Sequence, residues 1–418
     1  MKKKDFNIHI IGAGVSGLIA AKVLEANGFC PIIIEATERA GGRVKTDVIE
    51  GYHLDRGFQV LLTAYPAAQK YLDLDALDLQ KFTPGTVIFN GGKQSIIGDP
   101  LRDGSLLFST LVSRIGTITD KLKVLKLNRL LKRKTLSEIF EEEEKTTMSY
   151  LMDFGFSFQM INQFFKPFFS GVFLEPSLHT SSRMFEFVYK MFGEGSAALP
   201  KFGIEAIPRQ LAQSLTRTTF KYNTMVSSIK DGEILLTNGK SLKSDFTIVA
   251  TDASNLIQNL NRQSTKWKSC DTLYFETKTR VIDKPLIGLI TDSGALINNI
   301  FFHTSLEMAT KPQAELLSVT VVKNHDLSNE ALISRVQREL RDHCGINSYK
   351  FLKHYSIPMA LPELKNIQYE APPSETHLTS GIFLAGDTQL NASLNAAMIS
   401  GERAALGVVE TINNSILF

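Results

Sequence analysis

Residues 8–17 of the chain read IHIIGAGVSG, and this stretch decides the fold. A short, mainly apolar run at 8–11 leads into glycines at positions 12, 14 and 17, which is the GxGxxG pattern. Gly12 permits the tight turn after a strand, Gly14 lets the backbone approach a phosphate, and Gly17 lets the next helix pack closely on that strand. The pattern therefore predicts a strand, a glycine turn and a helix whose N-terminus faces a phosphate group.

The residues after the glycine turn complete a nucleotide-binding unit. The helix pattern runs to Asn27 and Gly28, a typical C-terminal stop, and a second apolar strand covers 31–34. Glu35 ends that strand, roughly 20 residues after the glycines, where an acid accepts hydrogen bonds from a ribose. The sequence thus predicts a Rossmann-type dinucleotide site, although this motif alone fits NAD and FAD equally.

Composition excludes several classes of protein. The chain has 418 residues, 43% hydrophobic and 21% charged, which suggests two or three globular domains and excludes intrinsic disorder and disulfide scaffolds. The net charge of +3 is too small to indicate a nucleic-acid partner. No apolar stretch reaches the ~18 residues of a membrane-spanning helix, and no metal-ligand spacing is present.

The start of the chain also resembles a signal peptide, because three lysines precede an apolar run. Glycines at 12, 14 and 17 are poor choices for a signal helix, and no small-residue cleavage site follows cleanly. Cys30, Cys270 and Cys344 lie far apart, which is typical of a reduced compartment. We therefore expect a cytoplasmic protein.

The segment after Glu35 narrows the cofactor. Residues 37–43, TERAGGR, resemble the segment that follows the ribose-binding acid in flavin amine oxidases, protoporphyrinogen oxidases and phytoene desaturases. Two adjacent glycines bring backbone close to a cofactor, and Arg43 can neutralise a pyrophosphate bidentately, the alternative being a surface salt bridge. Residues 55–60, DRGFQV, are similar to the stretch of these enzymes that passes beside the flavin.

A second flavin-type segment lies at the far end of the chain. A short strand at 382–385 ends in Gly386 and Asp387, and a helix is predicted over 393–412. In the resembling enzymes such an aspartate binds the ribityl chain and the helix N-terminus faces the isoalloxazine, where it stabilises negative charge. Ala396 and Ala397 stand where relatives usually have glycine-alanine, a mild departure.

The resemblance covers nearly the whole chain, with residues 198–211 as a further match, and it implies an FAD cofactor. Cys344 does not sit where some amine oxidases attach flavin, so we expect non-covalent binding. The residues that the resemblance and the motifs assign to FAD are Gly12, Ala13, Gly14, Val15, Ser16, Gly17, Glu35, Ala36, Arg39, Gly41, Gly42, Arg43, Gly57, Phe58, Gln59, Val226, Gly386, Asp387, Leu394, Asn395 and Ala396.

The predicted fold class is α/β, with a discontinuous Rossmann-type FAD-binding domain and an inserted α+β substrate domain. The FAD-binding domain is expected over 1–85, 200–262 and 375–418. The substrate domain is expected over 86–199 and 263–374, with 105–198 helical and 270–360 mainly strands around one helix near 329–341.

Two segments of the substrate domain allow two interpretations each. Residues 154–173 contain eight phenylalanines, which form either ordinary core or an apolar tunnel for a lipid-like substrate. Residues 121–134 carry seven basic residues interleaved with leucines, and four glutamates follow at 141–144. This pattern fits a peripheral contact with an anionic membrane or a solvated helix face.

No catalytic residue is assigned from the sequence. Amine oxidases of the resembling group carry a lysine on the strand beneath the flavin, but residues 270–275 contain none, and Lys266 and Lys268 lie just before them. Tyr355 is a candidate for the flavin-facing wall, whereas His303 and His354 fit core or surface roles.

Three functions follow. The first is an FAD-dependent oxidoreductase of the dehydrogenase or desaturase type, which removes hydride from an apolar, isoprenoid or lipid-like small molecule. The others are a flavin amine oxidase and a non-enzymatic isoprenoid carrier resembling the GDP-dissociation inhibitors. Retention of both flavin segments argues against the carrier, and the oligomeric state is left open.

Overall fold

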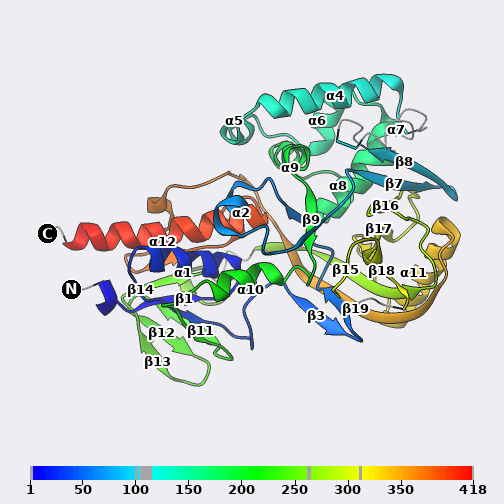
Figure 1. Cartoon of the computed structure of the whole chain (residues 1–418). Coiled ribbons are helices and arrows are strands. Elements are labelled where there is room, and N and C mark those ends of the chain that lie inside the picture. The colour runs from blue at the N-terminus through cyan, green and yellow to red at the C-terminus, as the bar shows by residue number, and fades with distance from the viewer. Residues whose placement is uncertain (1–2, 99–101, 104–114, 261–264, 310–312, 417–418) are drawn as a thin grey trace.

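The computed structural model describes residues 3–98, 102–103, 115–260, 265–309 and 313–416 (Figure 1). Its first layer is a five-stranded parallel sheet in the order β10-β2-β1-β14-β20. The strands are β10 (Thr219–Lys221), β2 (Ile32–Ile34), β1 (Ile8–Ile11), β14 (Phe246–Val249) and β20 (Ile382–Leu384). Parallel strands that are covered on both faces read as continuous apolar runs, which explains why β1 is buried at every position.

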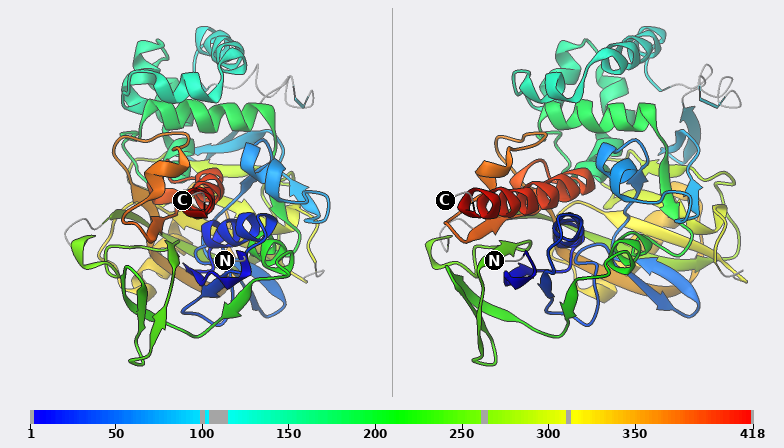
Figure 2. Two further views of the ribbon diagram at one scale, coloured as in Figure 1. Left: turned by 90° about the vertical axis from the view of Figure 1, so that its left-hand side faces the viewer. Right: turned by 60° about the vertical axis from the view of Figure 1, so that its left-hand side comes forward.

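Helices cover one face of this sheet and a small antiparallel sheet covers the other. Helix α1 (Val15–Ala26) crosses α12 (Leu394–Ile416), and α10 (Ala206–Gln213) packs beside α1 (Figure 2). On the opposite face, Val226 and Ile229 share an apolar cluster with Ile11 and Val249. The antiparallel sheet consists of β11 (Val226–Lys230), β12 (Glu233–Leu236) and β13 (Ser241–Lys243).

A seven-stranded mixed sheet forms the second half of the molecule, in the order β19-β15-β18-β17-β16-β7-β8. Apolar residues of helix α11 (Asn329–Cys344), including Leu332 and Val336, cover one of its faces. The strands are β19 (Ser348–Glu363), β15 (Lys266–Thr277), β18 (Glu315–Val321), β17 (Ile297–Phe302), β16 (Ile287–Ile290), β7 (Gly85–Asn90) and β8 (Lys93–Gly98). The other face looks toward the parallel sheet, so the two sheets enclose the middle of the molecule (Figure 1).

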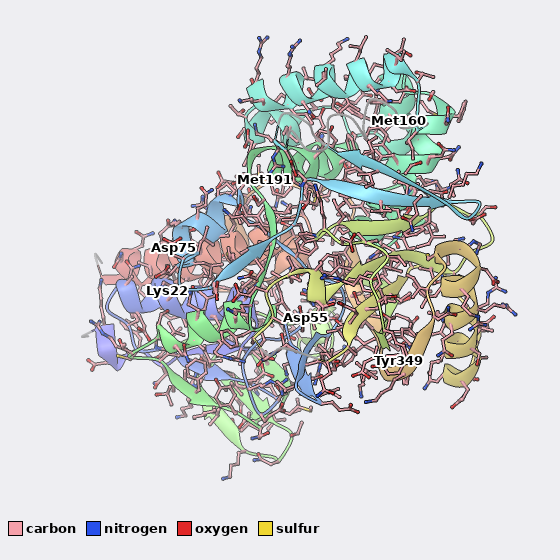
Figure 3. All side chains as sticks on the ribbon, turned by 45° about the vertical axis from the view of Figure 1, so that its right-hand side comes forward. Lys22, Asp55, Asp75, Met160, Met191 and Tyr349 are labelled. Carbon is pink, nitrogen blue, oxygen red and sulfur yellow. The ribbon has the colours of Figure 1, made fainter. Side chains whose placement is uncertain are left out.

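Short elements connect the two sheets. They are the hairpin β3 (Thr46–Ile49) and β4 (Tyr52–Asp55), the sheet of β5 (Leu61–Leu62), β9 (Ala197–Pro200) and β6 (Leu79–Lys81), helix α2 (Pro66–Tyr71), and the 3-10 turns Lys3–Asp5, Gln258–Leu260, His303–Ser305, Pro373–Thr376 and Asp387–Gln389. Asp55, labelled in Figure 3, lies near the centre of the molecule where β4 passes between the two sheets.

A helical layer caps the seven-stranded sheet at the top of Figure 1. It comprises α4 (Ile118–Arg133), α5 (Leu136–Glu141), α6 (Thr147–Asp153), α7 (Phe158–Met160), a π-helical turn (Ile161–Phe165), α8 (Lys166–Phe173) and α9 (Ser182–Glu194). Of the stretch 105–198 predicted as helical, residues 105–114 lie outside the described part of the chain. None of the helices in that described part is long and apolar enough to cross a membrane.

Most of the phenylalanine-rich segment is core, as the first interpretation predicts. Phe165, Phe169 and Phe173 are buried, and the Phe169 and Phe185 rings lie 4.7 Å apart between α8 and α9. Phe158 points outward and is 68% exposed. Only part of the segment therefore remains for a tunnel.

Candidate functional site

A cavity of about 2040 Å³ runs between the parallel sheet and the seven-stranded sheet. Ordinary ligand pockets measure about 300–1,000 Å³, so this cavity has room for a large cofactor and a substrate together. Gly12, Glu35, Ala250 and Gly386 line it, and each follows the carboxyl end of a strand of the parallel sheet. Ligands of open α/β sheets bind at this edge.

The glycine turn leaves backbone bare at the cavity wall. Gly12 has φ of 104°, and a Cβ on Gly17 would lie 2.1 Å from the Gly12 carbonyl oxygen, so neither position tolerates a side chain. The Gly41 N–H donates to the Ala13 carbonyl at 2.9 Å, and a Cβ on Gly42 would lie 3.2 Å from the Gly14 Cα. The two glycine segments therefore touch and form one cradle of the kind that a pyrophosphate needs.

Glu35 is fixed at the edge of this cradle. One carboxylate oxygen accepts from the Ala13 N–H at 2.8 Å, and the other accepts from the Thr37 N–H at 2.9 Å and the Thr37 hydroxyl at 2.8 Å. Glu35 is 8% exposed and lines the cavity. Its remaining lone pairs have the chemistry to accept from ribose hydroxyls, and contact of Glu35 with a nucleotide stays a prediction.

Arg43 and Asp387 bring the two distant motifs together. The Arg43 guanidinium donates to a carboxylate oxygen of Asp387 and lies 5.1 Å from the centre of the Trp267 ring. Asp387 is only 6% exposed, whereas the Arg43 side chain is 44% exposed, and both line the cavity. A cation and an acceptor at one point of the wall fit a ligand that carries both phosphates and hydroxyls.

Two helix N-termini reach the same region. Gly14 is the N-cap of α1, and the Ser393 hydroxyl accepts from the Ala396 N–H at 2.9 Å as α12 begins. A Cβ on Gly401 would lie 2.1 Å from the Ser16 carbonyl oxygen, which shows how closely the two helices cross. Both N-termini favour negative charge in the cavity.

The stretch after Asp55 forms the wall between the two sheets. Gly57 has φ of 101°, and its Cβ would lie 3.0 Å from the Ile357 methyl group. The Gln59 side-chain amide donates to the Arg43 and Arg56 carbonyls at 3.0 Å each. Phe58 packs against buried Phe301 of the seven-stranded sheet.

The structure brings two thirds of the predicted site residues to one cavity. Those on its wall are Gly12, Gly14, Val15, Ser16, Glu35, Gly41, Gly42, Arg43, Gly57, Phe58, Gln59, Gly386, Asp387 and Leu394. Those behind the wall are Ala13, Gly17, Ala36, Arg39, Val226, Asn395 and Ala396.

Two residues behind the wall have other partners. The Arg39 guanidinium donates to Glu205 at 2.9 Å and Asp47 at 3.1 Å, and these bonds raise the pKa of Arg39. Asn395 is fully buried and accepts from the Ala67 N–H at 3.0 Å. Both contacts position the loops around the cavity, and direct contact of these residues with a cofactor stays a prediction.

The substrate-domain end of the cavity is an apolar chamber. We use this name for the wall formed by Leu62 of β5, Phe168 and Val172 of α8, Phe192 of α9, and Ile287 and Leu289 of β16. Its polar edge is Asn299 of β17 and Thr320 of β18, whose amide and hydroxyl lie 3.4 Å apart. Sequence reasoning missed this pair. The available signal was that each of two otherwise apolar strands contains a polar residue.

The two candidate lysines lie in different surroundings. Lys266 is exposed, whereas Lys268 is half-buried on the cavity wall. The Lys268 ammonium donates to the Phe173 carbonyl and the Thr180 hydroxyl, both at 3.1 Å, and burial lowers the pKa of Lys268. Lys268 is thus held toward the helical layer by neutral oxygens.

The other sequence candidates hold structural contacts. The Tyr355 hydroxyl lines the cavity and donates to Asp47 at 2.8 Å. His303 is buried beside the Ser318 hydroxyl at 3.0 Å, and burial lowers the pKa of His303 to about 4, so the ring is neutral at pH 7. His354 lies 2.7 Å from an Asp271 oxygen. His354 and Asp271 thus form a His–carboxylate pair beside the cavity, because His354 lies on its wall.

The cysteines offer no reactive thiol at the cavity. Cys270 lies on the wall and is 7% exposed, and burial raises the pKa of its thiol to about 12. Cys344 lies under α11 in the core of the second sheet. A thiol with such a pKa stays protonated and is a poor nucleophile toward a flavin.

Curated relatives match part of the chain. An L-amino acid oxidase (Bs29) of Bothriechis schlegelii is 29% identical over 153 residues, which is 35% of this chain and 29% of that protein. An L-amino-acid oxidase of Sistrurus catenatus edwardsii is 40% identical over 73 residues, 18% of this chain and 14% of that protein. The matched regions thus span less than a third of the length of these relatives.

Solved structures match along the whole chain in fold. A protein proposed to be a protoporphyrinogen oxidase, from Exiguobacterium sp. 255-15, superposes with a TM-score of 0.71 at 17% identity, over 98% of this chain and 99% of that one. Putrescine oxidase bound to putrescine gives 0.70 at 16% identity, over 97% and 99%. A fatty acid isomerase from P. acnes gives 0.70 at 16% identity, over 96% and 98%.

The family itself is settled by the sequence profile described as flavin containing amine oxidoreductase, which matches residues 15–409. This range spans both flavin-type segments, from the glycine turn to α12. It confirms the predicted α/β fold and the FAD cofactor, and it assigns an oxidoreductase rather than a carrier. The chain belongs to the flavin-containing amine oxidoreductase family.

Proposed function

We propose that this enzyme removes hydride from an apolar, isoprenoid or lipid-like substrate that lies in the apolar chamber. The observation that carries the proposal is the composition of the chamber, whose six defining side chains are all aliphatic or aromatic. Burial of hydrocarbon there supplies affinity without polar contacts. Asn299 and Thr320 at its edge offer hydrogen bonds to a single polar group of such a substrate.

The residues at the other end of the cavity fit FAD. The cradle of Gly14 and Gly42 would hold the pyrophosphate, Glu35 the ribose, and Asp387 the ribityl hydroxyls. Arg43, now paired with Asp387, would offset phosphate charge. FAD, when bound, supplies the hydride acceptor, and the chain holds the substrate C–H bond against it.

The protein contributes orientation and exclusion of water. Gly57, Phe58 and Gln59 separate the cradle from the chamber, and the two glutamine amide bonds fix this segment. The tight approach of Gly57 to Ile357 leaves no room for a side chain at this point. A substrate in the chamber would therefore meet the cofactor beside bare backbone.

An amine oxidase is the second candidate, because the curated relatives are named as L-amino-acid oxidases. An ammonium group would need a carboxylate partner; the six residues that define the chamber include none, whereas Glu144 and Glu175 lie elsewhere on the wall of the same cavity. Lys268 is the group to suspect as the lysine of that reaction, yet its ammonium donates to the helical layer. The chamber therefore favours the apolar substrate.

Anaerobic bleaching of the flavin absorbance tests this choice. We expect isoprenoid or acyl compounds to bleach the flavin, and two added methylenes to tighten binding by roughly tenfold until the chamber is full, at about 0.8 kcal/mol per CH₂. Phe168→Ala should weaken this binding by about tenfold. The control Phe158→Ala, on an exposed ring of the same segment, should leave it unchanged. Bleaching by primary amines alone would establish the amine oxidase instead.

A further inference from the structure

Helix α4 presents an unusual outer face. Its inner side is ordinary core, because Leu127 and Leu131 are buried. Its outer side exposes three large apolar residues: Ile118 is 78% exposed, Leu122 61% and Leu130 40%. Such side chains are normally scattered on a protein surface, whereas here they share one helix.

Basic residues accompany these apolar side chains. Lys126, Arg129, Lys132 and Arg133 are exposed, and within the described ranges none of them lies within 4.0 Å of a carboxylate. Other basic side chains of the segment have partners in the protein: Lys134 pairs with Glu142 and Glu186, Lys123 donates to the Gly155 carbonyl, and the Lys126 ammonium lies 5.5 Å from the centre of the Phe154 ring. The positive charge of the outer face is thus left to solvent or to a partner.

Helix α4 itself carries no exposed acidic side chain. The acidic residue of α4 is Asp120, which is fully buried and caps the helix with Thr117. Asp120 also accepts from the Ser157 N–H at 2.8 Å and the Ser157 hydroxyl at 2.6 Å. These bonds hold the start of α7 against the start of α4, so Phe158, which is 68% exposed, lies near the N-terminal end of α4.

The position of the face leaves it open to a large partner. Helix α4 is the outermost helix of the helical layer, at the end of the molecule away from the β11–β13 sheet (Figures 1 and 2). Met160, labelled in Figure 3, lies beneath it and is 1% exposed. Below α4 lies α9, tied to it by the Lys190 ammonium, which donates to the Leu131 carbonyl at 2.8 Å. Helix α9 in turn supplies Phe192 to the apolar chamber.

We propose that the outer face of α4, together with Phe158, docks on the surface of an anionic lipid bilayer. Ile118, Leu122 and Phe158 would enter the interface between headgroups and acyl chains. The basic side chains would lie among anionic headgroups, an attraction that falls off within a Debye length. An acidic protein or polymer would use the charges but not the inserted apolar side chains, which is why the bilayer is the better match.

Vesicle co-sedimentation of the FAD-loaded enzyme tests the proposal. The probes are phosphatidylcholine vesicles with and without phosphatidylserine, each at low and at high salt. We expect sedimentation with the serine-containing vesicles, weakened by salt, and at least a tenfold loss of binding in Arg129→Glu/Arg133→Glu. The matched control is Lys240→Glu/Lys243→Glu on the β11–β13 side, which changes the net charge equally and should bind as the parent does.

A second variant separates a bilayer from a soluble polyanion. Ile118→Asn/Leu122→Asn removes the apolar side chains and keeps every charge, so it should also lose most vesicle binding. All substituted residues are exposed or half-buried at the surface, and an unchanged flavin-to-protein absorbance ratio checks folding. Binding that ignores phosphatidylserine, equal losses in the control pair, or full binding by the asparagine variant would overturn the proposal. Because the readout is sedimentation, its failure is distinct from failure of the proposed reaction.

Discussion

Gly401 lies where α12 crosses α1, and Gly401→Ala is the sharpest test of how the two flavin-type segments depend on each other. The new Cβ would lie 2.1 Å from the Ser16 carbonyl oxygen, whereas ordinary contact begins at 3.4 Å, so the helices must separate by more than 1 Å. Overpacking of this kind costs about 1–3 kcal/mol. Ser16 lines the cavity at the start of α1, so the separation also displaces the glycine turn.

We therefore expect two losses in Gly401→Ala. The free energy of unfolding, measured by urea denaturation, should fall by about 1–3 kcal/mol. The dissociation constant for FAD, measured by titrating the apoprotein, should rise roughly tenfold, because about one hydrogen bond at the cradle is lost. The control is Gly193→Ala in α9, where a Cβ meets nothing within 4 Å. Unchanged stability and FAD affinity in Gly401→Ala would refute the close crossing of α1 and α12.

Four further predictions follow from single contacts. Glu35→Gln should weaken FAD binding by roughly ten- to a hundredfold, because a charged acceptor is lost and the glutamine NH2 replaces one of the two oxygens that accept from the Ala13 and Thr37 N–H groups. Arg43→Met should weaken FAD binding by about tenfold in titration and show a smaller salt dependence than the parent. Burial lowers the pKa of His303 and of His9 to about 4, so below pH 6.5 the unfolded chain binds more protons than the folded chain. The free energy of unfolding, measured by urea denaturation, should therefore fall as the pH drops from 6.5 to 4. A free energy of unfolding that stays constant over this range would contradict the prediction. Lys268→Met should leave bleaching by apolar substrates within about threefold of the parent's rate, whereas a loss on the order of a hundredfold would make Lys268 part of the reaction.

The parallel sheet and the cradle were predictable because their signals are local. Gly12 is required by its backbone conformation, and Gly17 is required by close packing within the same strand-turn-helix unit. Both requirements can be recognised from the spacing of the glycines in the sequence. Glu35 bonds to Thr37 two residues away and to Ala13 22 residues away, within the same strand-helix-strand unit. The contacts of these residues therefore lie within one short unit of known geometry.

The rest depends on contacts between segments that are distant along the chain. The guanidinium of Arg43 meets Trp267 and Asp387, which no spacing rule connects. Asn299 and Thr320 lie opposite each other because of the register of β17 and β18. The apolar pattern of the two strands does not determine that register. Arg39 shows the converse, since its motif suggests a cofactor contact and the fold supplies Glu205 as its partner.

The phenylalanine-rich segment shows why composition alone does not locate a substrate site. Phe165 and Phe168 are close in sequence and chemically identical, yet the first is buried between helices and the second lines the chamber. The helical period decides which face each ring occupies, and the neighbouring helices decide what that face meets. The core interpretation thus holds for rings such as Phe165, whereas a tunnel lined by Phe168 stays a prediction.

The central claim is that one FAD fills the cavity between the glycine turn and α12, held without a covalent bond. The most direct measurement is the absorbance spectrum of the purified chain after saturation with FAD and removal of the free cofactor, followed by denaturation and separation of the precipitate. We predict a yellow protein with one flavin per chain, all of which passes into the supernatant on denaturation. A colourless chain that retains no flavin after reconstitution would contradict the site, and flavin that stays with the precipitate would contradict its non-covalent attachment.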